Sequence, residues 1–372
     1  MFNILILMPD SIPIGMGGLS THINNLLKDF DSSFYFHVIG ADKSDKTVRT
    51  GDNYTFYPIS RDNNYADDWV IYPTSIIDSY IKHIHNKTKI DLVHCCDWNT
   101  IVAGEFVAEL LNIKKIIAFH LPLNLDNEKD LSNWITYTQY ILEKDAHENF
   151  DKIIYVSEYI KLKAETHGFN GSNMITIPNG IDVNEFEDVE RIELGNFKHK
   201  YLFIGRAVAQ KGIYELLDTY LDEDSALYIV APENGSDPEA IKMIKQACEL
   251  SKNIFYLGEK HGEEKIQILK SVDYVVMPSI YEPFGIVALE AFASFRILIT
   301  SGVHGLSDFT NNENSIQIKR VHPMHIREAM LKAKDLSFVE RSAMKLIANT
   351  TSKSYTWDKV RNQYLTIYKE LL

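Results

Sequence analysis

Short apolar runs of strand length alternate along this chain with longer stretches in which apolar residues recur at helical spacing. Asn3–Met8 is the first apolar run, and Leu19–Phe30 is the first amphipathic stretch. Continuous apolar strands separated by helices are typical of a parallel sheet that is covered by helices on both faces. The sequence therefore predicts an α/β fold built from successive strand–helix units.

The alternation occurs twice, and this divides the sequence into two series. The expected strands of the first series are Asn3–Met8, Phe34–Ile39, Leu92–His94, Lys115–Phe119, Ile153–Val156 and Met174–Ile177. Those of the second series are Tyr201–Ile204, Ala226–Val230, Ile254–Leu257, Asp273–Met277 and Ile297–Thr300. The charged segment Asp182–Lys200 lies between them. We interpret it as an exposed crossing between domains, with an ordinary surface loop as the alternative.

At about 150 residues per domain, 372 residues have room for roughly two to three domains. We expect a Rossmann-like doubly wound domain over residues 1–182 and a second one over residues 183–356, facing a central cleft. The last stretch, 357–372, carries apolar residues along one helical side. This helix packs either on the second domain or back on the first.

The composition narrows the possible functions. The formal net charge is −13. This argues against a protein that coats nucleic acid, because an acidic surface repels phosphates. No apolar run reaches the ~18 residues of a membrane span, although peripheral membrane association stays compatible with the sequence. The cysteines, Cys95, Cys96 and Cys248, lack metal-ligand spacing. Together with a start that lacks the basic patch of a secretory signal, they lead us to expect a cytoplasmic protein with reduced thiols.

Ligands in doubly wound folds bind outside the carboxyl ends of the strands, so the strand-to-helix turns are the candidate sites. The first turn contains Gly15, Gly17 and Gly18. Glycines let the backbone approach a ligand closely, and a helix start offers N–H groups to an anion. The third glycine of a dinucleotide fingerprint is missing, which disfavours a nicotinamide dehydrogenase. A tight turn that requires positive φ angles is the alternative.

The second turn places Arg206 at the end of a strand and Lys211 just before the next helix. Two cations beside a helix start can neutralise a diphosphate and the charge that develops when it leaves. Solvated loop charges are the alternative.

The third turn holds two carboxylates: Glu282 in the loop before a helix that starts near Gly285, and Glu290 within that helix. Pro283 keeps Glu282 in the loop before the helix, because proline does not fit a helix interior. Glu290 follows about 7–8 Å along the helix axis. One carboxylate can reach a sugar ring and the other a ribose, since carboxylates accept paired hydrogen bonds from hydroxyls. A helix cap and a surface glutamate are the alternative roles.

The segment Glu282-Pro-Phe-Gly-Ile-Val-Ala-Leu-Glu290, with Gly205-Arg206 and Lys211-Gly212 upstream, resembles the retaining GT-B glycosyltransferases. Within them it is similar to the large family of glycogen synthases, sucrose-forming synthases and bacterial cell-surface sugar transferases. Pro178-Asn179-Gly180-Ile181-Asp182 matches that family at the end of its first domain. The resemblance runs from about residue 4 to residue 300 and implies a GT-B fold.

The resemblance also implies roles for individual residues. Arg206 and Lys211 would hold the donor diphosphate, Glu282 the transferred sugar, and His120 would contact that sugar as it moves. The implied donor-binding residues are Gly17, Gly18, Gly205, Phe284, Gly285, Ile286, Val287 and Glu290. Asp97 lies in a partial match to a histidine-rich segment of glycogen synthases, where it either touches acceptor or donor hydroxyls or caps the helix near Thr100.

The expected activity is transfer of a hexose from a nucleoside-diphosphate sugar to a hydroxyl acceptor with retention of configuration. The resemblance favours a UDP- or ADP-glucose-type donor, leaves the acceptor class open and requires neither metal nor cofactor. The alternatives are a GT-B-shaped nucleotide-sugar epimerase and a non-catalytic protein that binds sugar nucleotides.

Overall fold

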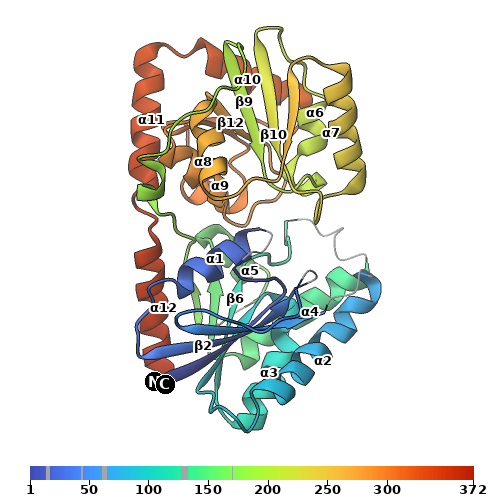
Figure 1. Ribbon diagram of the computed structural model, residues 1–372, viewed down its shortest axis with the longest axis vertical. Coiled ribbons are helices and arrows are strands. Elements are labelled where there is room, and N and C mark those ends of the chain that lie inside the picture. Colours follow the sequence, from blue (N-terminus) through green and yellow to red (C-terminus); the bar gives the residue numbers. More distant parts are fainter. Residues whose placement is uncertain (14–16, 43–44, 61–64, 127–132, 170) are drawn as a thin grey trace. The chain divides into compact units, whose positions relative to one another are not determined.

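The computed structural model describes residues 1–13, 17–42, 45–60, 65–126, 133–169 and 171–372. Its contacts divide the chain into two compact units. Unit 1 comprises residues 1–178 together with 357–372, and unit 2 comprises residues 179–356. Each unit is a doubly wound α/β structure (Figure 1), which confirms the predicted fold class.

The sheet of unit 1 is built around strands whose side chains are buried on both faces, as the apolar runs predict. Its strands are β1 (Phe2–Met8), β2 (Phe34–Ala41), β3 (Arg49–Thr50), β4 (Tyr54–Ile59), β5 (Leu92–Cys96), β6 (Lys114–Phe119), β7 (Lys152–Tyr155) and β8 (Met174–Thr176). Within the described residues their order is β3-β4-β2-β1-β5-β6-β7-β8. Neighbours are parallel except for β3 against β4, a short edge pair that the sequence did not predict.

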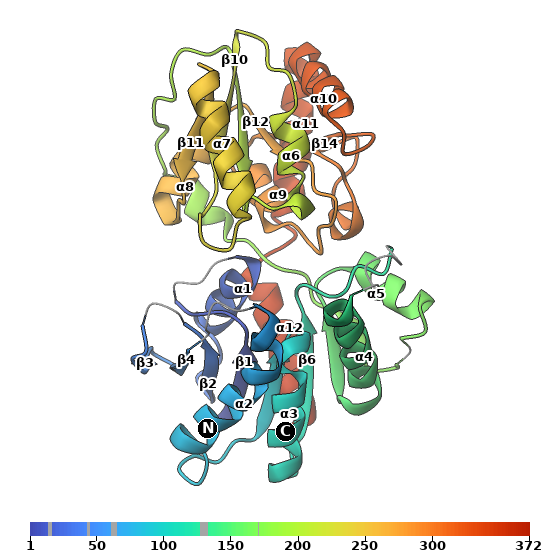
Figure 2. The same ribbon diagram turned by 90° about the vertical axis from the view of Figure 1, so that its right-hand side faces the viewer.

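Helices cover both faces of this sheet (Figures 1 and 2). The helices of unit 1 are α1 (Gly18–Leu27), α2 (Tyr65–His83), α3 (Ile101–Leu111), α4 (Trp134–Asn149), α5 (Glu158–Thr166) and α12 (Trp357–Leu371), with the short 3-10 helix η1 (Trp98–Thr100). α1 and α12 pack on one face together with Ile4, Ile6 and Met8 of β1. α2 and α3 lie on the other face.

The last helix, α12, belongs to the core of unit 1. Its apolar stripe joins the same cluster as β1 and α1; the stripe consists of Trp357, Val360, Tyr364, Ile367 and Tyr368. The Tyr368 hydroxyl also pairs with Nδ1 of His94 at 2.8 Å, in the buried centre of the unit. The chain therefore returns to its first unit after completing the second.

Unit 2 repeats the same architecture with a smaller sheet. Its strands are β9 (His199–Ile204), β10 (Ser225–Val230), β11 (Ile254–Gly258), β12 (Tyr274–Met277), β13 (Ile297–Thr300) and β14 (Ser315–Gln317). Within the described residues their order is β11-β10-β9-β12-β13-β14, and all neighbouring pairs are parallel. The strand order reverses between β9 and β12, which defines the topological switch point of the unit.

The helices of unit 2 are α6 (Ile213–Leu217), α7 (Pro238–Leu250), α8 (Gly262–Ser271), α9 (Ile286–Ala293), α10 (Pro323–Asp335) and α11 (Phe338–Ser352). The short 3-10 helices are η3 (Val183–Phe186), η4 (Ala209–Lys211) and η5 (His304–Asp308). α6, α7 and α10 share one apolar cluster with the sheet, whereas α9 packs against β12, β13 and α11. In the described part of the chain, no helix combines the length and apolarity needed to cross a bilayer.

Candidate functional site

The predicted phosphate-binding residues of unit 2 lie at its switch point. Gly205 and Arg206 directly follow β9, and the segment 278–285 follows the neighbouring strand β12. In open α/β sheets, ligands bind in the crevice outside the carboxyl ends of the strands, at the point where the strand order reverses. The topology therefore brings together two sequence segments about 70 residues apart, as the separation of Lys211 from Glu282 illustrates.

The loops after β9 and β12 are joined by their backbones. The carbonyl of Gln210 accepts the N–H of Ile280 at 2.8 Å and also the N–H of Tyr281 at 3.3 Å. Gly212 lies against the other loop with φ 69°, and a Cβ there would stand 2.0 Å from the Pro278 carbonyl oxygen. Only glycine tolerates both this conformation and this contact. The two loops therefore form one fixed substructure.

Lys211 and Glu282 form an ion pair within that substructure. The Lys211 Nζ lies 2.6 Å from Oε2 of Glu282, which also accepts the Ser279 hydroxyl at 3.3 Å. The Glu282 side chain is only 8% exposed, and that of Lys211 is 22% exposed. Because a carboxylate in so little water needs a partner, the lysine both neutralises it and fixes its direction.

Glu290 is held in the same way by a lysine that the sequence analysis did not identify. Lys265 of α8 places its Nζ 2.5 Å from Oε1 of Glu290 in α9. The two helices are neighbours in the ribbon (Figure 1). The sequence does predict a helix after β11, another strand of the same sheet, and this helix carries Lys265. Nothing in the sequence of that helix distinguishes Lys265 from its other lysine.

The start of α9 lies between the two glutamates. Its N-cap is Gly285 with φ 100°, and no described side chain caps it. A Cβ at Gly285 would lie 2.5 Å from the Leu306 side chain of η5. The first N–H groups of a helix have no partner inside the helix, so those of Ile286 and Val287 are suited to an anion. Phe284 contributes its ring to the buried core, 5.2 Å from that of Phe309.

Arg206 differs from the two lysines because its charge is uncommitted. Among the described residues, its guanidinium makes no hydrogen bond or ion pair, and the side chain is partly exposed. Gly205 before it, with φ 141°, donates its N–H to Val230 at 3.0 Å and so continues the sheet pairing. The guanidinium thus remains available to an anionic ligand.

In unit 1, Asp97 links the ends of β5 and β6. Its Oδ1 accepts the N–H of His120 at 2.7 Å and that of Leu121 at 2.8 Å. Burial raises the pKa of this carboxyl to about 6, although the two N–H donors act in the opposite direction. Asp97 occupies the N-cap position of η1, but the alternative role as a side-chain cap is wrong, because the carboxylate makes no capping hydrogen bond there and instead binds the loop after β6.

His120 follows β6 and packs against another histidine. Its ring lies 4.5 Å from that of His22 in α1, edge to face. Its Nε2 is buried and has no hydrogen-bond partner in the described part of the chain. Burial, reinforced by His22 and His94, holds the pKa of His120 well below its usual range, so the ring is neutral. Sequence reasoning missed His22, which the α1 helix brings to this position.

The glycine turn after β1 is only partly described. Gly17 has φ 117° and is the N-cap of α1, which begins at Gly18. Both are exposed, whereas Gly15 lies outside the described residues. Arg49 supports the start of this turn, because its Nη2 donates to the Ile12 carbonyl at 3.0 Å.

Glu143 of α4 is a buried acid beside the loop that follows His120. It is 1% exposed and accepts the N–H of Leu123 at 3.0 Å and the Gln139 amide at 2.6 Å. Burial raises its pKa from the ordinary 4.5 to about 8. The folded protein therefore binds this proton more tightly than the unfolded chain does.

This shift predicts a pH dependence of stability. Folding is favoured by the Glu143 proton at low pH, and that contribution is lost as the pH rises from about 4.5 to about 8. We expect the melting temperature of the wild type to fall over this range relative to that of Glu143→Gln, whose side chain stays neutral. Buried His120, whose pKa is lowered, acts in the opposite direction but equally in both proteins, so the difference between their thermal unfolding curves, monitored by circular dichroism, isolates Glu143. An unchanged slope in the variant would contradict the assignment.

The described residues hold no group of three or more His, Cys, Asp and Glu side chains arranged to bind a metal ion. The polar groups collected at the switch point of unit 2 are instead two lysine–glutamate pairs, one free guanidinium and a helix start. Such a set matches a ligand that carries both hydroxyls and anionic oxygens.

Two family models match this chain in succession. One, described as Glycosyltransferase Family 4, covers residues 16–185, and the other, Glycosyl transferases group 1, covers residues 185–352. The chain is 25% identical to an uncharacterized glycosyltransferase of Methanocaldococcus jannaschii, over 95% of this chain and 94% of that protein.

Solved structures share the fold at low sequence identity. Sucrose-phosphate synthase from Thermosynechococcus elongatus superposes with a TM-score of 0.87 at 17% identity, over 100% of this chain and 99% of that one. HepE of Anabaena, in complex with UDP-glucose, superposes with a TM-score of 0.78 at 14% identity over the whole of both chains. With the two family models, these similarities establish that the chain belongs to the GT-B glycosyltransferases.

Proposed function

We propose that the protein is a retaining glycosyltransferase that moves a hexose from a nucleoside-diphosphate sugar to a hydroxyl acceptor. The observation that carries this proposal is the arrangement at the switch point of unit 2. There, Lys211–Glu282 and Lys265–Glu290 flank the start of α9, and Arg206 has no hydrogen bond or ion pair with any residue that the structure describes. An elongated ligand with a sugar, a diphosphate and a ribose fits this sequence of groups from one end to the other.

The diphosphate occupies the middle of the proposed site. Arg206 and Lys211 neutralise it, with help from the N–H groups at the start of α9. As the bond to the sugar breaks, negative charge grows on the leaving oxygen and the attraction of both cations increases. The cations and the helix start supply this stabilisation, so the proposal requires no metal or other cofactor.

The two ends of the donor are assigned to the two glutamates. Glu282, directed by Lys211 and Ser279, accepts from hydroxyls of the transferred sugar. Glu290 accepts from the ribose. The acceptor oxygen is proposed to attack from the face that the diphosphate leaves, with the leaving phosphate as base, which retains the configuration of the sugar.

Unit 1 is proposed to serve the acceptor side. We assign His120 to contact with the transferred sugar, and Gly17 and Gly18 to the phosphates or the acceptor. A neutral imidazole suits that contact, because it places no positive charge beside an oxocarbenium-like centre. The remaining oxygen of Asp97 is assigned a hydroxyl contact, while its Oδ1 holds the His120 loop.

UDP- or ADP-glucose-type donors are the proposed substrates. Support comes from HepE of Anabaena, a protein of the same fold whose structure contains UDP-glucose. We further propose that the enzyme works in the cytoplasm, since its described cysteines are all free.

A donor panel tests the proposal directly. Purified protein is incubated with UDP- and ADP-linked hexoses and several hydroxyl acceptors, and nucleotide release is measured. Release that depends on the acceptor, with a product whose anomeric configuration equals that of the donor by NMR, is the expected result. An inverted product would refute retention, and conversion of the donor into an epimeric nucleotide sugar without any acceptor would instead indicate an epimerase.

Glu290→Gln is expected to weaken nucleotide binding by roughly 10-fold or more, because a charged acceptor contributes about 1.5–3 kcal/mol to a hydrogen bond. The substitution keeps the shape of the side chain and removes its charge. Calorimetric titration with UDP and ADP measures the change. Unchanged affinity would reject the ribose assignment.

A further inference from the structure

Lys265, like Lys211, pairs with a buried glutamate. Most lysine–glutamate pairs in the described residues lie on the surface, as Lys245–Glu233 does with side chains 52% and 63% exposed. In Lys265–Glu290 the carboxylate is only 9% exposed and the lysine 26% exposed. Exposed pairs such as Lys245–Glu233 contribute little to folding stability, whereas a buried carboxylate needs a partner to offset the cost of its lost hydration.

Both members of this pair stand on fixed helices. α8 is anchored by its buried residues Ile266, Ile268 and Leu269, which follow Lys265. α9 is buried almost throughout, from Ala288 to Ala293. The Nζ–Oε1 distance of 2.5 Å therefore joins two elements that packing already holds in place. The carboxylate has one preferred direction as a result.

The pair still has free hydrogen-bonding capacity. Within the described residues, Oε2 of Glu290 makes no hydrogen bond, and Lys265 uses its ammonium only for Oε1. An ammonium carries further N–H donors, and a hydroxyl both donates and accepts. A hydroxyl beside the pair can thus donate to Glu290 and accept from Lys265 at the same time.

We propose that Lys265 is a positioning and specificity residue for the nucleoside end of the site. It holds Glu290 toward the ribose and adds a donor to the same hydroxyls, so that the pair selects ribonucleotides over deoxyribonucleotides. This inference rests on the proposed function, because it takes Glu290 to be the ribose ligand. It adds a residue, and a selectivity, that the motif carrying Glu290 does not contain.

Calorimetric titration with UDP, 2′-deoxy-UDP and 3′-deoxy-UDP tests the proposal, with ADP and its deoxy forms as a parallel series. Lys265→Met is expected to weaken binding of the ribonucleotide about 10-fold, as loss of a charged hydrogen bond does. For at least one deoxynucleotide, which lacks the hydroxyl that Lys265 contacts, the same substitution should weaken binding less than about 3-fold. Lys265→Arg should restore most of the loss, because it keeps the charge and the donors.

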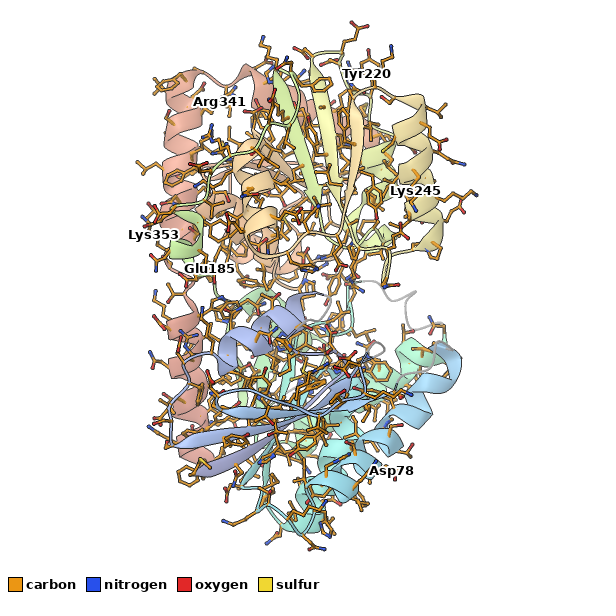
Figure 3. All side chains as sticks on the ribbon, in the orientation of Figure 1. Asp78, Glu185, Tyr220, Lys245, Arg341 and Lys353 are labelled. Atoms are coloured by element: carbon orange, nitrogen blue, oxygen red, sulfur yellow. The ribbon has the colours of Figure 1, made fainter. Side chains whose placement is uncertain are left out.

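Two further variants separate positioning from a general structural effect. Lys245→Met removes a lysine from an exposed pair on α7, at a position labelled in Figure 3, and should leave all affinities unchanged. In a double-mutant cycle, Lys265→Met and Glu290→Gln should be non-additive, because each removes the same contact. If Lys265 had a merely structural role, its loss would weaken the binding of ribo- and deoxynucleotides equally and would not depend on one hydroxyl.

The outcomes distinguish this inference from the function on which it rests. If the wild type binds neither UDP nor ADP, the proposed function fails and the inference fails with it. If the wild type binds the ribonucleotide and Lys265→Met binds it equally well, only the inference is overturned. Equal losses for ribo- and deoxynucleotides also overturn it, because selectivity for the hydroxyl is its central claim.

Discussion

Lys211→Ala is expected to lower turnover by about 10²-fold or more, because the lysine is assigned to the charge that develops on the leaving diphosphate. The loss should appear in kcat, since an interaction that strengthens in the transition state affects the chemical step. Steady-state assays of nucleotide release with a saturating donor measure it. A variant with near-normal turnover would remove Lys211 from the mechanism.

Removing Lys211 has two effects that the experiment must distinguish. Removal of Lys211 also leaves the buried carboxylate of Glu282 without its cation. Lys211→Ala therefore combines a lost catalytic charge with an unpaired acid. Glu282→Gln alone loses the proposed sugar contact, and the Lys211→Ala, Glu282→Gln double variant removes the lysine in that background, where no buried charge is left unpaired; Lys245→Ala provides the surface control. If the double variant turned over as fast as Glu282→Gln, the lysine would serve only to neutralise Glu282.

Removal of α12 is expected to unfold unit 1. The helix contributes Trp357, Tyr364 and Tyr368 to the same buried cluster as β1 and α1. Truncating one large buried side chain costs about 3–5 kcal/mol, and the whole stability of a domain is about 5–15 kcal/mol. A chain that ends at residue 356 should lose the amide-exchange protection of β1 and β5, whereas β9 and β12 of unit 2 keep theirs.

A point variant makes the same test without truncation. Tyr368→Ala opens a cavity and removes the hydroxyl that pairs with His94 at 2.8 Å. We expect about 3–5 kcal/mol of destabilisation in denaturant unfolding. Tyr137→Ala on α4, where the residue is 55% exposed, is the matched control and should change stability by less than about 0.5 kcal/mol. Similar effects of the two variants would contradict a core role for α12.

Local sequence was enough to predict the frame of the candidate site in unit 2. Strand, turn and helix follow one another within one segment around Glu282 and Glu290, so chain connectivity alone places the two carboxylates at one strand end. The same holds for Arg206 and Lys211 after β9. The strands β3, β4 and β14 were not predicted, because β3 and β14 are only two and three residues long and β4 is only partly buried, so none of them has a clear apolar run.

Interactions between distant segments could not be predicted in this way. Lys265 meets Glu290 across 25 residues, and Asp97 meets His120 across 23. Periodicity shows which side of a helix is buried but not which residue of another element it faces. Asp97 illustrates the consequence, since a strand-end aspartate before a helix suggests a cap and in fact holds the neighbouring loop.

The sequence by itself determined the α/β class, the two doubly wound series and the turns that carry Arg206, Lys211, Glu282 and Glu290. These features follow from hydrophobic period and chain order, which are local. Only the tertiary structure decided that α12 joins the core of unit 1, that Lys265 holds Glu290 and that His22 lies against His120. An apolar stripe or a charged side chain is compatible with many partners, and packing of the whole unit selects one of them.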